Sequence, residues 1–225
     1  MEKKEFPKKA PTRISEGTKA PSPPLGLSAK AFGIIKFILG LLLLPFVYAL
    51  TKSFLSEAGL IGLQPQRYFW AGIASFIIVH LFIYEPAIIY RSGHRMLEDC
   101  VQLFAPLVKV APYVLPIYAI VVFGAYLLLS LIIKSEWLTN ISLFLIGFSF
   151  VLHLTFSAKA VRAKQGDFLK ANYIFGFSFI YIVNVLLVSL ILSAIFKDFS
   201  FVRLFKDSYS SAQNVFYVVF KQLFL

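Results

Sequence analysis

The first apolar run of the chain, residues 31–54, reads AFGIIKFILGLLLLPFVYALTKSF and carries charge only at Lys36 and Lys52. About 20 predominantly apolar residues in a helix cross the hydrocarbon core of a bilayer, so this run predicts a transmembrane helix. Lys36 lies close enough to one end for its amine to reach the headgroup region. Pro45, inside the run, predicts a kink. The run decides the fold because four more of the same kind follow it.

The composition extends this prediction to the whole chain. Of its 225 residues, 59% are hydrophobic, 17% are aromatic and only 15% are charged. A soluble domain has about 25% charged residues, so the bilayer is the solvent that this chain fits. The predicted fold class is all-α, a polytopic transmembrane helical bundle of five spans. The spans after the first are Tyr68–Tyr84, Val114–Ile133, Trp137–Phe156 and Tyr173–Phe196.

Three regions follow from the distribution of apolar residues. Residues 1–28 are basic and Pro-rich, with too few large apolar side chains for a core, which predicts a disordered cytoplasmic tail. The apolar run after it begins too late for a secretory signal peptide, so the first span is expected to be retained. Residues 29–196 form the transmembrane domain. Residues 197–225 mix aromatic and polar residues, and this segment is expected to lie in the interface, dock on the bundle or re-enter as a sixth span.

Basic residues set the expected orientation and the expected surface partners. The formal charge is +11. With a cytoplasmic N-terminus, fourteen of the 22 Lys and Arg residues fall on the cytoplasmic side and seven on the other, which favours this orientation. The basic residues flank apolar runs, so anionic lipid headgroups explain them more simply than nucleic acid does. Cys100 is the one cysteine of the chain, which excludes an internal disulfide and a multi-cysteine metal site.

The segment 84–100, YEPAIIYRSGHRMLEDC, gathers charged and metal-ligating residue types beside the second span. His94 and Glu98 are four positions apart, so they share a face if the segment is helical. Arg95 is three and four positions from Glu98 and Asp99, a spacing that also suits ion pairs along a helix. The residues alone leave two interpretations open, a site and a cluster of paired charges at a membrane end.

These residues belong to a pattern that continues along the chain. The pattern consists of 90–94 (YRSGH), 111–116 (APYVLP), 147–157 (GFSFVLHLTFS), 165–168 (QGDF) and 180–184 (IYIVN). Its order resembles the membrane-embedded zinc metallopeptidases of the site-2 protease type, in a bacterial branch with Tyr-x-x-Gly-His-Glu-x-x-His followed by Ala-Pro-Tyr-x-x-Pro. The resemblance covers about residues 68–196. It implies a bacterial inner membrane, a helical bundle and a zinc site.

The metal-binding motif of that family is altered in this chain. In HExxH, two His nitrogens one turn apart bind zinc, and the Glu between them takes a proton from the metal-bound water. The corresponding residues read HRMLE, so Arg95 occupies the general-base position and Glu98 that of the second His. A guanidinium stays protonated and cannot accept the proton. The resemblance leaves His94, Glu98 and Asp167 as zinc ligands without a base. Asp167 lies in a basic loop, where pairing with a neighbouring lysine is the simpler role.

The polar residues within the predicted spans include two histidines, His80 and His153, and an asparagine in the middle of the fifth span, Asn184. A polar side chain at this depth is expected to hydrogen-bond to a neighbouring helix. Ionisable residues inside membranes also mark transport paths, so a polar path through the bundle stays open as a second interpretation.

These observations favour an integral membrane protein that resembles an intramembrane metallopeptidase but lacks its catalysis. Such a protein would bind another membrane protein as a scaffold or assembly subunit and would need no cofactor. Two alternatives stay open. One is a divergent, active zinc protease that uses His94, Glu98 and Asp167, and the other is a transporter or channel subunit.

Overall fold

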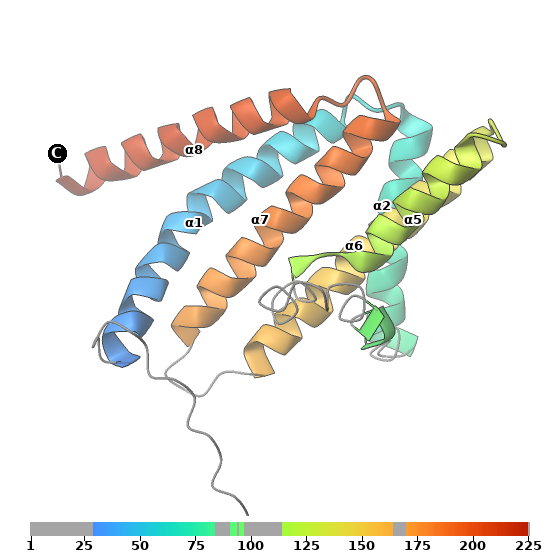
Figure 1. The fold of residues 1–225 in the computed structure, drawn as a ribbon. Helices are drawn as coiled ribbons and strands as arrows, with labels where there is room; N and C mark the ends of the chain where they lie inside the picture. Colours follow the sequence, from blue (N-terminus) through green and yellow to red (C-terminus); the bar gives the residue numbers. More distant parts are fainter. Residues whose placement is uncertain (1–28, 84–90, 94, 97–113, 164–169, 225) are drawn as a thin grey trace, which may run out of the picture.

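The computed structural model describes residues 29–83, 91–93, 95–96, 114–163 and 170–224, which are helical apart from short turns (Figure 1). The predicted tail, residues 1–28, lies outside them. The helices are α1 (Ala29–Ala58), α2 (Leu63–Ile78), its π-helical continuation η1 (Val79–Ile83), α5 (Ile117–Ser130), α6 (Glu136–Ala163), α7 (Lys170–Ile195) and α8 (Phe201–Phe224). No strand occurs within the described ranges.

Three of these helices are long and apolar enough to cross a bilayer. The stretches that qualify are Gly33–Ala58 of α1, Glu136–Arg162 of α6 and Tyr173–Ile195 of α7. They correspond to the first, fourth and fifth predicted spans, so membrane-length apolar helices are confirmed at these three places. The second and third predicted spans correspond to shorter helices, the run of α2 with η1 and the apolar α5. The predicted count of five spans is therefore not confirmed.

The helices pack in two groups that meet along α6 and α7. In the first group, α7 and α8 both lie against α1. In the second group, α2 and α5 both lie against α6. Figure 1 shows the first group in the left half of the molecule and the second in the right half. The C-terminal segment thus docks on the bundle as α8, with α1 as its main support.

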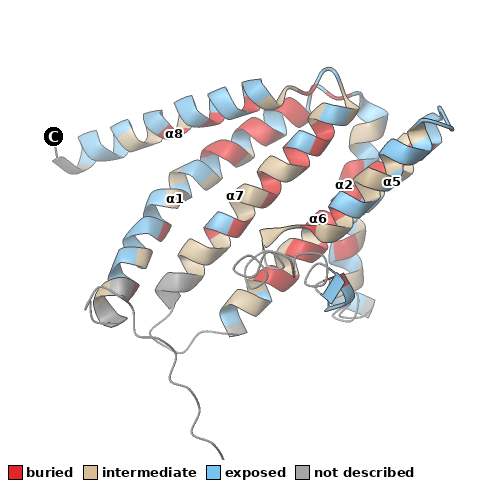
Figure 2. Ribbon diagram, in the orientation of Figure 1, coloured by how far each residue is buried: buried red, intermediate tan, exposed pale blue. Residues whose placement is uncertain are grey.

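The two groups share a core at the end of the bundle where the α1–α2 and α7–α8 turns lie. The ring of Phe54 in α1 lies 6.2 Å from that of Phe69 in α2 and 6.2 Å from that of Phe199 in the α7–α8 turn. All three residues are buried. Figure 2 shows this buried end and, in contrast, the long exposed sides of α1 and α8. The apolar residues on the exposed side of α1 have the character of a lipid-facing surface.

α2 and α6 cross with their backbones in contact at two glycines. A Cβ atom on Gly72 would overlap the backbone carbonyl of Phe144, and one on Gly147 would overlap that of Phe69. Each glycine lets the opposite helix approach where a side chain would hold it off, which is how small residues promote helix packing in membranes. The crossing lies near the middle of both helices.

We expect Gly72→Ala and Gly147→Ala each to destabilise the fold by about 1–3 kcal/mol, the usual effect of forcing atoms into a packed contact. The measurement is the free energy of unfolding in detergent micelles. Gly124→Ala is the matched control, because nothing lies within 4 Å of a Cβ atom at that position. The higher helix propensity of alanine should make this control neutral or more stable by up to about 1 kcal/mol. Equal effects at all three glycines would contradict the backbone crossing.

Candidate functional site

The structure covers only part of the site that the resemblance implies. His94, Glu98 and Asp167 lie outside the described residues. Arg95, which occupies the general-base position, is exposed. Within the described ranges, no three His, Cys, Asp or Glu side chains come together as metal ligands would. Zinc binding therefore stays a prediction from the sequence.

Two of the motifs that carry the resemblance meet in space. Gly93, the residue before His94, is buried against the side chains of Ile117 and Tyr118 at the start of α5. A Cβ atom on Gly93 would lie 2.8 Å from Cζ of Tyr118 and 2.9 Å from Cγ2 of Ile117, too close for a side chain unless the ring moves. The absence of a side chain at Gly93 thus allows residues 91–93 to pack against the start of α5, the helix that follows the APYVLP motif.

His80 lies in η1, at the end of the helical run that precedes the polar segment. Its ring is stacked on that of Phe76, with centroids 5.6 Å apart, and meets that of Phe156 edge to face at 5.9 Å. The Nζ atom of Lys159 lies 3.3 Å from Nε2 of His80 and 5.4 Å from the Phe156 ring centroid. An ammonium group can only donate, so Nε2 accepts and the ring proton is on Nδ1. That buried Nδ1 has no hydrogen-bond partner within the described part of the chain.

The His80 contact brings the C-terminal ends of η1 and α6 together. The segment that holds His94 follows η1, and the loop that holds Asp167 follows α6. The residues that precede these two polar segments therefore lie at the same end of the bundle. π-Helical turns are frequent at functional sites, and this one holds a histidine against α6.

His153 and Asn184 have other neighbours. The Nε2 atom of His153 lies 3.2 Å from Oγ of Ser157, one turn further along α6, and both residues are buried. Asn184 is fully buried, and its Nδ2 donates to the carbonyl oxygens of Val114 and Ile180, each at 2.8 Å. Asn184 thereby ties α7 to the chain just before α5. The three predicted intramembrane polar residues are thus held by three different sets of neighbours.

A polar crevice of about 330 Å³ lies at the other end of α2, between α2, α5, α6 and α7. Its polar lining comes from Gln64 of α2, Tyr126 of α5 and Glu136, Thr139 and Asn140 of α6. The hydroxyl oxygens of Tyr126 and Thr139 are 3.5 Å apart. The crevice contains no residue that the sequence analysis selected.

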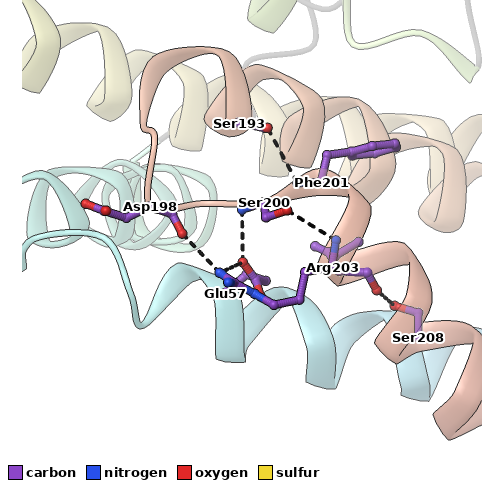
Figure 3. Close-up of polar contacts among 8 residues, drawn as sticks. Glu57, Ser193, Asp198, Ser200, Phe201, Arg203 and Ser208 are labelled. Carbon is purple, nitrogen blue, oxygen red and sulfur yellow. Dashed lines mark hydrogen bonds and ion pairs between the residues drawn. The ribbon is translucent and has the colours of Figure 1, made fainter.

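An ion pair between a buried carboxylate and a half-exposed guanidinium joins the end of α1 to the start of α8 (Figure 3). The side chain of Glu57 is 4% exposed and that of Arg203 is 48% exposed. Arg203 donates from Nε to Oε1 of Glu57 and from Nη2 to Oε2, the latter at 2.7 Å. The planar fork of arginine makes this two-bond geometry available. The N–H of Ser200 also donates to Oε2, at 3.0 Å.

The same region begins α8. Oγ of Ser200 accepts from the N–H of Arg203 at 3.3 Å, the hydrogen bond of a helix N-cap. The N–H of Phe201 donates to Oγ of Ser193 at 3.5 Å, and Nη2 of Arg203 donates to the carbonyl of Asp198 at 3.1 Å. A carboxylate beside a helix N-terminus is also favoured by the helix dipole. One side chain of α1 thus fixes both the α7–α8 turn and the first turn of α8.

The guanidinium of Arg203 is protonated at every physiological pH, so the buried carboxylate of Glu57 always faces a positive charge.

Sequence reasoning missed this pair. Glu57 is the one acidic residue between positions 31 and 83, and it lies near the end of an apolar run. An ionisable residue in such a place needs a partner, and this signal could have selected Glu57. Its partner is 146 positions away, so only the fold identifies Arg203.

Comparison of the chain with protein-family models, curated proteins and solved structures found no match. The resemblance to metallopeptidases of the site-2 protease type therefore rests on the motifs quoted above.

We expect Arg203→Ala to lower the midpoint of thermal unfolding by roughly 5 °C, because it leaves a buried carboxylate without its partner. Glu57→Ala and the double variant complete a double-mutant cycle. Paired residues should give a double variant less destabilised than the two single effects together. Lys197→Ala, which removes an exposed charge from the α7–α8 turn, is the control and should change the midpoint little. Additive effects of the two substitutions would show that the ion pair does not form.

Proposed function

We propose that this protein is a non-catalytic membrane scaffold that resembles intramembrane metallopeptidases and serves as an assembly subunit for another membrane protein. The observation that carries the proposal is Arg95. It occupies the position that the resemblance gives to the general base, and its guanidinium cannot accept a proton from a metal-bound water. Its side chain is exposed.

The buried polar residues of the described bundle support the same proposal. Glu57 and Asn184 contact other parts of the bundle, and His153 contacts Ser157 of its own helix. Peptide hydrolysis requires an activated nucleophile with a base and an orienting group around one point. In the described ranges these residues serve helix packing instead. We therefore expect the bundle to act through what it binds.

We infer five spans in a bacterial inner membrane, with the N-terminus in the cytoplasm. α1, α6 and α7 supply three of them, and the α2–η1 run and α5 supply the others. The contact between His80 and Lys159 supports the alternation of these spans, since the second and fourth spans end on the same side in either orientation. The exposed Arg91, Arg95 and Arg162 at this end suit the anionic headgroups of the cytoplasmic leaflet.

α1 offers an apolar side to a partner. Ile34, Ile38 and Leu42 recur at helical spacing and are all exposed. Such a stripe fits a helix of another membrane protein as well as it fits lipid. Cross-linking from a residue of this stripe shows whether a protein helix or lipid covers it.

We expect the purified protein to contain zinc well below one ion per chain, and His94→Ala to leave that content unchanged. The measurement is elemental analysis by mass spectrometry of protein purified in detergent. The double variant Arg95→Glu, Glu98→His recreates HExxH and is the positive control, expected to gain zinc. Stoichiometric zinc in the natural sequence that is lost with His94→Ala would overturn the proposal in favour of an active zinc protease.

The assembly role has a separate test, photo-cross-linking in membranes of the source organism. A photoreactive residue in place of Ile38 is expected to give a protein adduct of one defined mass. Leu128 of α5 is also apolar and exposed, and the same residue there is the control, expected to give lipid adducts only. Lipid adducts alone at both positions would contradict the assembly role.

A further inference from the structure

α8 folds back along α1 instead of leaving the bundle (Figure 1). Two contacts fix its path. Arg203 pairs with Glu57 near the end of α1, and the ring of Phe216 lies 5.6 Å from that of Phe46. Along a helix, residues 203 and 216 are about 20 Å apart and residues 57 and 46 about 16 Å apart. The two helices are therefore antiparallel neighbours over this distance.

This path takes α8 into the membrane depth of α1. The candidate span of α1 is Gly33–Ala58, and Phe46 lies at its middle. Phe216 is therefore level with the centre of that span. The residues of α8 between 203 and 216 are level with the half of the span that ends at Ala58. α8 has 24 residues and is about 36 Å long, but it is not among the helices that are apolar enough to cross a bilayer.

Around its axis α8 has three sectors with different surroundings. The first sector is buried against α1, the second is apolar and exposed, and the third is polar and exposed. In this order the sectors contain Leu204, Ser208 and Ala212, then Val202 and Phe205, then Lys206, Asp207, Ser210, Gln213 and Asn214. Tyr209 lies between the second and third sectors, and its hydroxyl accepts a hydrogen bond from Nε2 of Gln213 at 3.1 Å. We call the third sector the polar face. The apolar sector borders α7, because Phe205 lines a crevice of about 80 Å³ with Ile182 and Leu186. The polar face points away from α7.

Lipid cannot cover the polar face at this depth. Hydrocarbon offers no hydrogen bonds, so charged and amide side chains within a membrane lie against protein or water. The five side chains of the polar face are exposed in the described part of the chain. Arg203, one turn before Asp207, already pairs with Glu57. No segment in the described ranges covers the polar face, and a partner molecule can supply the missing contacts.

We propose that the polar face of α8 is the interface with a second copy of this chain. The polar face contains both partners of the ion pairs and hydrogen bonds that two copies would form with each other. Lys206 is cationic and its neighbour Asp207 is anionic, while the amides of Gln213 and Asn214 both donate and accept hydrogen bonds. This inference is independent of the proposed scaffold function.

A two-fold axis along the membrane normal makes the face self-complementary. Residues of equal depth then meet across the axis, so Lys206 of one copy reaches Asp207 of the other. The amides of Gln213 and Asn214 meet their counterparts in the same way. Hydrogen bonds between such amides are an established means of helix association in membranes.

Cysteine cross-linking of the full chain in membranes, in a Cys100→Ala background, tests the proposal. Ser210→Cys and Asn214→Cys are expected to form disulfide-linked dimers on oxidation. Val202→Cys and Phe205→Cys, in the apolar sector, are the controls and should yield at least about tenfold less dimer, as expected when one face alone is apposed. Equal dimer from both sectors, dimer from neither, or an adduct with a different protein would overturn the proposal.

The oligomeric mass in lipid nanodiscs gives a second measurement. The natural sequence is expected to be a dimer, and the variant Gln213→Leu, Asn214→Leu should dissociate about tenfold more readily, the effect of losing one or two interhelical hydrogen bonds. Phe205→Leu, in the apolar sector, is the control and should remain dimeric, and an unchanged unfolding midpoint verifies that each variant is folded. A monomer whose Ser210→Cys and Asn214→Cys variants react with a membrane-impermeant maleimide would show that α8 lies at the lipid surface, which overturns the proposal.

Discussion

The ion pair between Glu57 and Arg203 determines where the last helix of this protein can lie. A carboxylate buried near the end of an apolar helix has to be neutralised, and the guanidinium that does so belongs to the first turn of α8. Because the same carboxylate also accepts the N–H of Ser200, it fixes the turn as well as the helix. An amphipathic helix without such an anchor settles in the headgroup region. Here the anchor directs α8 along α1.

The sequence predicted the long helices because the bilayer imposes both a length and a composition on them. α1, α6 and α7 satisfy both requirements. α2 and α5 were harder to delimit, since apolar character extends beyond the helix itself. α5 begins directly after Pro116, although the apolar run around it starts earlier. α2 becomes π-helical at Val79, one residue before His80, while the sequence on both sides stays largely apolar. Hydropathy indicates whether a side chain lies in lipid, protein or water. It does not indicate where a helix begins or where its backbone hydrogen bonds change from the α to the π pattern.

The sequence allowed the polar residues of the spans to be selected by type, but it did not show which groups they contact. His80, His153 and Asn184 were selected because polar side chains in spans are rare, yet their neighbours depend on how the helices cross. Asn184 bonds the carbonyl of Val114, which no spacing in the sequence could indicate. Gly72 and Gly147 look like isolated glycines until the structure sets them opposite each other's helix. The sequence shows which residue types occur in each segment. Which distant segments face each other is known only from the fold.

The glycine crossing of α2 and α6 also restricts how these two helices can move against each other. With the backbones in contact near the middle of both helices, sliding is sterically blocked, and the motion that remains is a scissor-like rotation about the crossing. The crevice that contains Gln64 and Asn140 lies on one side of this crossing, and the contact between His80 and Lys159 lies on the other. A rotation that widens the crevice therefore also separates His80 from Lys159. Opposite ends of the helix pair are mechanically linked in this way, without a chain of polar groups between them.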